Sequence, residues 1–158
     1  MTPTSTLAQA TMLTYELSLD STTLSASHVG VRFSLHNPTA EVAYVNPLQT
    51  PFAEPAGRPF EVVCGGESVS YVGRMIKRAP AHPDEFLRID PGGSRSTEVD
   101  LAQSYEFSGG SECELSFDAG RVEVRWAVPD RPDQARPSAD AARGVGSGEP
   151  LRFRLPTP

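Results

Sequence analysis

The 158-residue chain has no apolar run that approaches the roughly 18 residues a membrane-spanning helix needs. Its first stretch, MTPTSTLAQATMLTYELSLD, has neither a basic region nor a continuous apolar region, so it does not read as a secretory signal. We therefore expect no membrane association. As written, the chain is predicted to be cytoplasmic, and it would be secreted or periplasmic if this sequence lacks its native signal.

Positive charge is also scarce. The chain has 14 Lys and Arg residues against 20 Asp and Glu residues, which gives a formal net charge of −6. Binding to nucleic acid or to an anionic membrane surface requires clustered Lys and Arg, because both targets are polyanions. The composition therefore argues against nucleic acid and membranes as partners.

Motifs for catalysis and metal binding are missing as well. His28, His36 and His82 do not form an HExxH pattern, and none has a second His or Cys at ligand spacing. No G-x-S-x-G nucleophile, phosphate loop or dinucleotide motif is present. Glu112 and Glu114 share the predicted solvent face of one strand. We therefore predict a protein without catalytic residues, metal or cofactor, and an enzyme of unrecognised type is the least favoured reading.

The chain has two cysteines, Cys64 and Cys113. Two thiols cannot form a disulfide framework, nor a zinc site on their own. Two interpretations stay open: a pair of buried thiols in a reducing compartment, which is the simpler one, and a single disulfide between sheets. Both cysteines fall on the inward face in the strand register described next.

Alternation of apolar and polar residues is the clearest pattern in the chain. In LTYELSL (13–19) the Leu and Tyr side chains fall on one face, and in VGVRFSLH (29–36) the Val, Phe and Leu side chains do the same. Such a period of two predicts half-buried β-strands. The same pattern recurs in FEVVC, CELSF, RVEVRWAV, which places Trp126 in the core, and LRFRL.

Turn signals separate these strands. The 13 Gly and 15 Pro residues argue against long helices, and CGGE and DPGGS are typical of tight turns. The sequence predicts an all-β fold: an antiparallel, immunoglobulin-like β-sandwich of about 8–10 strands in a single domain (1–158), with a closed barrel as the runner-up. Residues 1–11 are expected to be flexible. Residues 129–150 have almost no large apolar side chain, so we predict a flexible loop before the last strand.

The stretch YVGRMIKR carries three cations in an acidic chain. In the structural interpretation Tyr71 packs, Gly73 permits a close backbone approach, and the cations are solvated. In the functional interpretation Arg74, Lys77 and Arg78 meet an acidic surface on a protein partner. A third possibility is that Lys77 imitates the substrate of a peptidase that prefers lysine.

Between residues 41 and 117 the chain resembles a known family. The elements that carry the resemblance are Thr50-Pro51-Phe52, Phe60 to Val62, Tyr71 to Gly73, Lys77-Arg78, Ile89 to Ser94 and Val99 to Tyr105. In this order and spacing they are similar to the N-terminal β-sandwich domain of deuterolysin-like, peptidyl-Lys (aspzincin) zinc endopeptidases. The catalytic half of that family, with its HExxH helix and aspartate ligand, has no counterpart in this chain.

The resemblance implies an accessory or propeptide-like domain without its enzyme. A copy of this kind is expected to bind a peptidase of the zinc endopeptidase class, as an inhibitor or a folding helper. The loops 36–41, 46–59 and 73–85 are candidate contact regions, with Tyr71, Arg74, Lys77 and Arg78 as the expected binding residues. The alternative is a structural or adhesion-type subunit with no peptidase partner. The sequence leaves the oligomeric state open.

Overall fold

The structure, a computed structural model, describes residues 11–22, 24–53, 60–73, 82–128, 131–137, 143–146 and 148–157. These residues form strands and short 3₁₀ turns, with no α-helix among them. The strands are β1 (Thr14–Leu19), β2 (Gly30–His36), β3 (Ala43–Val45), β4 (Phe60–Cys64), β5 (Glu67–Ser68), β6 (Leu87–Ile89), β7 (Ser94–Asp100), β8 (Glu112–Phe117), β9 (Val124–Val128), β10 (Arg131–Pro137) and β11 (Leu151–Arg154). The 3₁₀ turns are η2 (Pro47–Gln49), η3 (Pro83–Glu85), η4 (Leu101–Gln103) and η5 (Ala119–Arg121). The predicted all-β class is confirmed.

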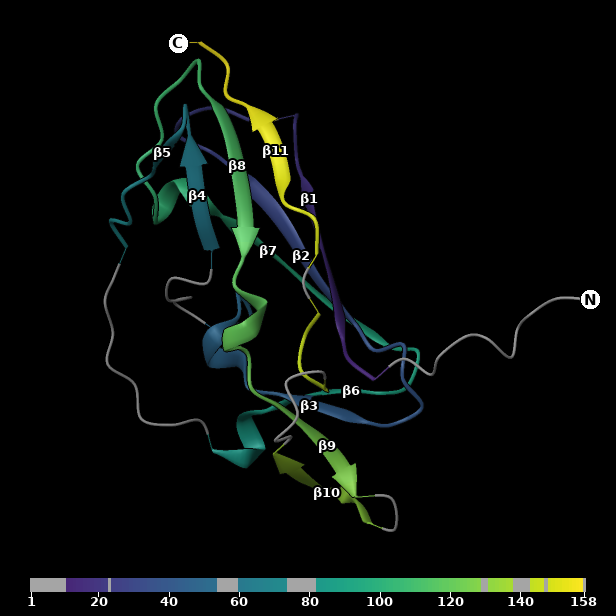
Figure 1. The fold of residues 1–158 in the computed structure, drawn as a ribbon. Coiled ribbons are helices and arrows are strands. Elements are labelled where there is room, and N and C mark those ends of the chain that lie inside the picture. The colour runs from purple at the N-terminus through teal and green to yellow at the C-terminus, as the bar shows by residue number, and fades with distance from the viewer. Residues whose placement is uncertain are drawn as a thin grey trace, which may run out of the picture.

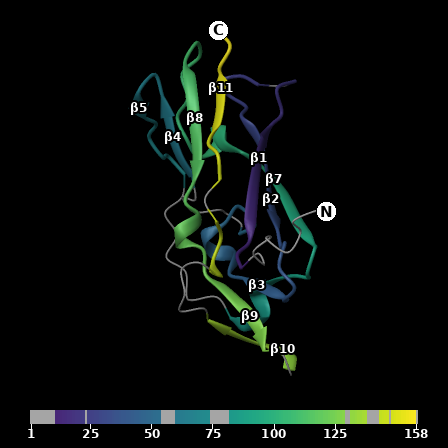
Figure 2. The same ribbon diagram turned by 45° about the vertical axis from the view of Figure 1, so that its right-hand side comes forward.

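The strands pair antiparallel in three sheets, with the orders β1-β2-β7, β10-β9-β3-β6 and β11-β8-β4-β5. The chain passes from β8 through η5 into β9, so the second and third sheets follow one another along the molecule (Figure 1). Turned by 45°, the view separates β1, β2 and β7 from β4, β8 and β11 as two facing layers (Figure 2). The finer assignment to an immunoglobulin-like sandwich stays a prediction.

Between these layers lies the core. The period-two pattern of β2 buries Val31, Phe33 and Leu35 almost completely. The ring of Phe33 lies 4.6 Å from that of Phe117 on β8 and 6.4 Å from that of Phe60 on β4, measured between ring centroids. The alternation along β2 thus directs Phe33 into the space between two sheets, where it contacts other aromatic rings. Burial of such rings is a main contribution to stability.

Tight turns form at CGGE and DPGGS, where the sequence predicts them. Gly65 and Gly66 have φ of 59° and 81° and connect β4 to β5. Gly92, with φ of 73°, lies in the turn between β6 and β7. These left-handed conformations are open to glycine and strained for other residues. The stretch DLAQSY contains the single 3₁₀ turn η4.

The segment 129–150 differs from the expectation of a loop. Residues Arg131–Pro137 form β10, which pairs with β9 through Arg131↔Val128 and Ala135↔Ala127, with an irregularity between them. Backbone hydrogen bonds make this ladder, so a strand can form there without the apolar side chains that the sequence pattern relies on. Residues 129–130, 138–142 and 147 lie outside the described part, as do residues 1–10 of the predicted flexible N-terminus.

Arg143, which follows β10 in the chain, contacts Trp126 on β9 and Glu41 before β3. Its guanidinium lies 4.4 Å from the ring centroid of Trp126 and forms an ion pair with Glu41. The indole Nε1–H of Trp126 donates to the Arg143 carbonyl at 2.7 Å. Trp126 itself is buried, as predicted for a core residue. Two residues further, Val145 is buried and forms a parallel bridge with Leu13.

Cys64 and Cys113 are joined by a disulfide. Of the two interpretations left open by the sequence, the structure therefore has the bridge and not the free thiols. The bridge does not join two sheets, however. Cys64 on β4 is the direct cross-strand partner of Cys113 on β8, so the bond links neighbouring strands of one sheet. Their pairing brings together cysteines 49 positions apart in the sequence.

Candidate partner-binding surface

The segment Tyr71–Gly73 is the described part of the predicted binding stretch. Tyr71 forms an antiparallel bridge with Tyr105. The N–H groups of Val72 and Gly73 both donate to the Ser104 carbonyl, at 2.7 and 3.2 Å, and Glu106 N–H donates to the Ser70 carbonyl at 3.1 Å. The backbone is therefore held firmly up to the residue where the cationic stretch begins.

Tyr105 is the centre of this arrangement. Its ring packs edge-on against Tyr71, with centroids 5.4 Å apart, and its hydroxyl donates to the Phe60 carbonyl at 2.7 Å. Tyr105 is buried, whereas Tyr71 is partly buried. Three elements that carry the family resemblance, at 60–62, 71–73 and 99–105, thus meet around one side chain. In the sequence, Tyr105 stands out only as the tyrosine that ends DLAQSY (100–105). Its spacing does not indicate which residues it contacts.

Val72 is the exception to the burial pattern. Its side chain is 58% exposed, and it is the one large hydrophobic side chain in the described ranges that is exposed to this extent. Tyr71 on one side of it packs toward the core, and Gly73 on the other side lies under the Tyr71 ring. A single exposed apolar side chain is common on protein surfaces, so the interest of Val72 lies in its place two residues before the cationic stretch.

Substitution of Gly73 by alanine is expected to displace the Tyr71 ring. A Cβ atom on Gly73 would lie 2.7 Å from both Cζ and Oη of Tyr71. The ring must move, which weakens its contact with Tyr105 and costs about 1 kcal/mol of unfolding free energy. The measurement is denaturant unfolding of Gly73→Ala in the wild-type and Tyr71→Ala backgrounds. Without the ring the substitution should cost nearly nothing, and equal losses in both backgrounds would contradict the contact.

Of the four predicted binding residues, the structure locates Tyr71 alone. Arg74, Lys77 and Arg78 lie outside the described residues, so their role stays a prediction. The candidate loop 36–41 is described and tied to the fold by Asn37, which is fully buried. In the loop 46–59, residues 46–53 contain η2, where Asn46 caps the turn by accepting from Leu48 N–H at 3.0 Å.

The histidines occupy strand and loop positions. His28 Nδ1 lies 3.0 Å from Asp100 Oδ2, and the other oxygen of Asp100 accepts from Val29 N–H and Ala102 N–H. This carboxylate therefore holds the start of η4 and the turn before β2. Hydrogen bonds from Thr22 lower the pKa of the Asp20 carboxyl below its usual value. His28, which lies across Gly30 from Asp20, adds a smaller electrostatic effect in the same direction.

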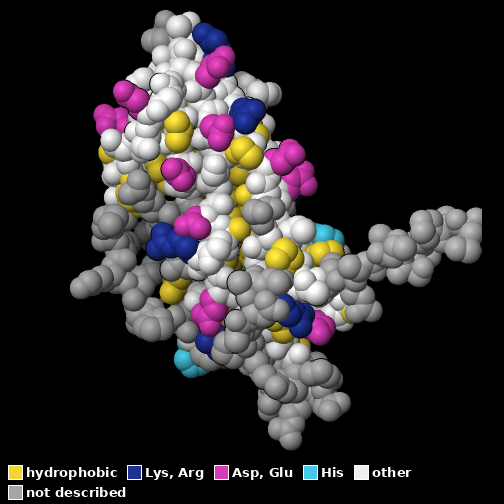
Figure 3. Space-filling view, viewed as in Figure 1, with side chains coloured by type: hydrophobic (Ala, Val, Ile, Leu, Met, Phe, Trp, Pro, Cys, Tyr) yellow, Lys and Arg dark blue, Asp and Glu magenta, His cyan; other side chains and the backbone are white. Residues whose placement is uncertain are grey.

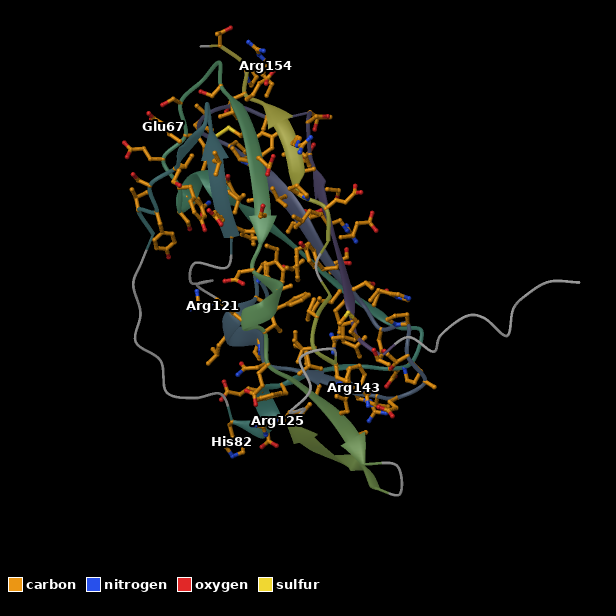
Figure 4. All side chains as sticks on the ribbon, in the orientation of Figure 1. Glu67, His82, Arg121, Arg125, Arg143 and Arg154 are labelled. Carbon is orange, nitrogen blue, oxygen red and sulfur yellow. A yellow bond between two sulfur atoms is a disulfide. The ribbon has the colours of Figure 1, made fainter. Side chains whose placement is uncertain are left out.

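The outer face of β8 and β11 carries paired charges. Glu112 binds Arg154 at 3.2 Å and Glu114 binds Arg152 at 3.1 Å, each pair directly across the two strands. Figure 3 shows carboxylate and arginine side chains side by side on this part of the surface. Figure 4 places Arg154 and Glu67 at one end of the molecule, and His82, Arg125 and Arg143 toward the other. Exposed pairs of this kind contribute little to stability.

Across the part of the chain that the structure describes, no group of three or more His, Cys, Asp or Glu residues is arranged to hold a metal ion. No helix within the same residues is long and apolar enough to cross a membrane. No protein-family model matches the chain. No curated protein matches it either. The candidate surface therefore depends on the residues themselves and on the resemblance that they carry.

Proposed function

We propose that this chain is a non-catalytic module that binds a peptidase, as an inhibitor or a folding helper. The observation that carries the proposal is the convergence of three elements of the resemblance on Tyr105, next to the exposed Val72. Backbone hydrogen bonds hold this part of the chain up to Gly73, the residue before the cationic stretch. A binding segment that is held at its base loses less entropy on binding than a free one.

The binding residues in this proposal are Tyr71, Arg74, Lys77 and Arg78. Three cations within five residues of an acidic chain favour an acidic surface on the partner. Lys77 has an additional property, because it is the single lysine of the chain. A lysine-specific peptidase would therefore find one possible recognition residue here.

Replacement of Lys77 by alanine is expected to weaken binding to the peptidase by about tenfold or more, because it removes one of the central cations of the stretch. Lys77→Arg separates the two possible reasons. If charge alone matters, arginine keeps the affinity; if Lys77 imitates a substrate, arginine loses it as alanine does. The measurement is an inhibition titration of a peptidyl-Lys zinc endopeptidase.

Arg121→Ala is the matched control for this titration. It also removes one cation, from a side chain that is 61% exposed and paired with Asp118 at 3.9 Å. It should leave the affinity unchanged. Equal potency of wild type, Lys77→Ala and Arg121→Ala would rule Lys77 out of the contact.

The experiment that tests the function itself is capture of partners on the immobilised chain from lysate and medium of the source cell. A captured zinc endopeptidase that loses activity on titration with the free chain supports the inhibitor. A captured endopeptidase that folds faster but keeps its activity supports the folding helper. Binding of no peptidase overturns the proposal and favours the alternative, a structural or adhesion-type subunit.

We further propose that the protein works in an oxidising compartment. The support is the Cys64–Cys113 disulfide, since such bonds persist outside the cytosol and are rare within it. This favours the secreted or periplasmic location over the cytoplasmic one.

A further inference from the structure

β7 and β10, with seven residues each, are the longest edge strands among the described residues. In the sheet order β1-β2-β7, one side of β7 pairs with β2 and no strand pairs with the other. Proteins usually protect such edges by shortening them, by placing proline on them or by placing charged side chains along them. The edge strands β5 and β6 have two and three residues, and β10 contains Pro132 and Pro137. β7 has seven residues and no proline.

The direction of the free backbone groups follows from the β2–β7 register. Asn37 N–H donates to the Gly93 carbonyl and Leu101 N–H donates to the Val29 carbonyl, both at 2.9 Å and both in the register of the ladder. Alternate pairs exchange hydrogen bonds in an antiparallel ladder. Arg95, Thr97 and Val99 therefore bond to β2. The groups that point to the free side belong to Ser94, Ser96, Glu98 and Asp100.

We propose that a second copy of this chain occupies this edge, in a two-fold symmetric dimer with β7 antiparallel to its counterpart. A two-fold axis at Thr97 pairs Ser94 with Asp100, Arg95 with Val99, and Ser96 with Glu98. The full length of the strand is then used, with roughly eight new backbone hydrogen bonds. The sheet becomes a six-stranded one across the two copies.

Charge complementarity selects this register. With the axis at Thr97 no like charges lie directly opposite. Ser96 lies opposite Glu98, and Ser94, whose hydroxyl is 2.9 Å from His36 Nδ1, lies opposite Asp100, whose carboxylate bonds to Val29, Ala102 and His28 of its own chain. Ser96 Oγ already contacts Ser34 Oγ at 2.8 Å, and a hydroxyl can accept one hydrogen bond while donating another. A shift that places the axis at Glu98 would set two glutamates against each other, which is unfavourable. A shift to Ser96 would shorten the overlap to five residues.

The remaining features of the strand are compatible with such pairing. Glu98 is held at the outer face by Arg32, at 3.5 Å, so its carboxylate does not cover the edge. The Nε–H group of Arg95 donates to the Arg88 carbonyl at 3.3 Å, near the beginning of the strand. A self-complementary patch of this kind is what a two-fold interface requires. The dimer rests on different observations from peptidase binding and does not depend on it.

The test is sedimentation equilibrium of the full chain from about 1 to about 500 µM, for the wild type, Ser96→Pro and Ser96→Ala. Proline removes the N–H that points away from β2, and leaves the β2 ladder intact. Alanine removes the same hydroxyl but keeps that N–H. We expect a concentration-dependent dimer for the wild type and Ser96→Ala, and a monomer for Ser96→Pro.

A second pair of variants keeps the test decisive if Ser96→Pro fails to fold. Ser96→Glu places a carboxylate opposite Glu98 twice in the dimer and should raise the dissociation constant about tenfold, whereas Ser96→Arg should lower it. A wild type that is monomeric throughout, or a dimer unaffected by all four substitutions, overturns the proposal. Protection of the Ser96 and Glu98 amides from exchange only after addition of a peptidase would also overturn it, because the edge would then belong to that partner.

Discussion

Substitution of Asn37 by alanine is expected to lower the free energy of unfolding by about 3–5 kcal/mol. Asn37 is fully buried, and its side chain uses every bond available to it. The amide Nδ2 donates to the carbonyls of Glu41 and Ile89, at 2.7 and 2.9 Å. The oxygen Oδ1 accepts from Thr39 N–H and Thr39 Oγ1, at 3.0 and 2.7 Å.

The size of the effect follows from what alanine leaves behind. The Ile89 carbonyl and the Thr39 N–H would lose their partners at a place where water does not reach. Each unsatisfied buried group costs about 1–3 kcal/mol. The backbone of Asn37 also bonds to Gly92 and Gly93, so the same residue joins the loop after β2 to the turn between β6 and β7.

Asn46→Ala is the matched control, measured by denaturant unfolding alongside Asn37→Ala. Asn46 also makes hydrogen bonds through both ends of its amide, to Leu48 N–H and to Glu123 Oε1, but it is only partly buried. Its removal should cost about 1 kcal/mol, the usual effect of losing a cap. If Asn37→Ala cost no more than Asn46→Ala, the buried network would not be what holds these loops together.

The sequence predicts strands well where one face is buried. The alternation in β1, β2, β4, β8 and β11 is readable because the core demands apolar side chains at every second position. The sequence pattern does not indicate β10, because residues 131–137 lack the alternating apolar side chains that mark the other strands. The backbone hydrogen bonds that pair β10 with β9 do not require such side chains. The predicted strand at 121–128 begins only at Val124, after η5.

Contacts between distant residues were beyond the sequence pattern. The hydrogen bond from Asn37 to the Ile89 carbonyl spans 52 positions and has no local signature. In the candidate site, too, the local packing was predictable and the distant contact was not. The packing of Tyr71 agrees with the structural interpretation of YVGRMIKR, but its partner Tyr105 depends on how the strands are ordered.

Removal of the disulfide with the double variant Cys64→Ala/Cys113→Ala is expected to cost about 4 kcal/mol of unfolding free energy. The bond closes a loop with a sequence separation of 49, and it restricts the unfolded chain accordingly. In the chain-entropy description a loop of that length corresponds to about 4 kcal/mol at 25 °C. The measurement is denaturant unfolding with and without a thiol reductant.

The reductant provides an internal control. Wild type should lose stability on reduction and approach the double variant, whose stability should not respond. Each single variant should already lose nearly the whole amount, because one cysteine cannot form the bond, so the two substitutions are strongly non-additive. Additive losses would mean that the effect comes from the packing of Cys113 in the core and of Cys64 beside it, and not from the bond. A wild type that is indifferent to reductant would show that β4 and β8 are held by their ladder and the Phe60–Phe117 contact alone.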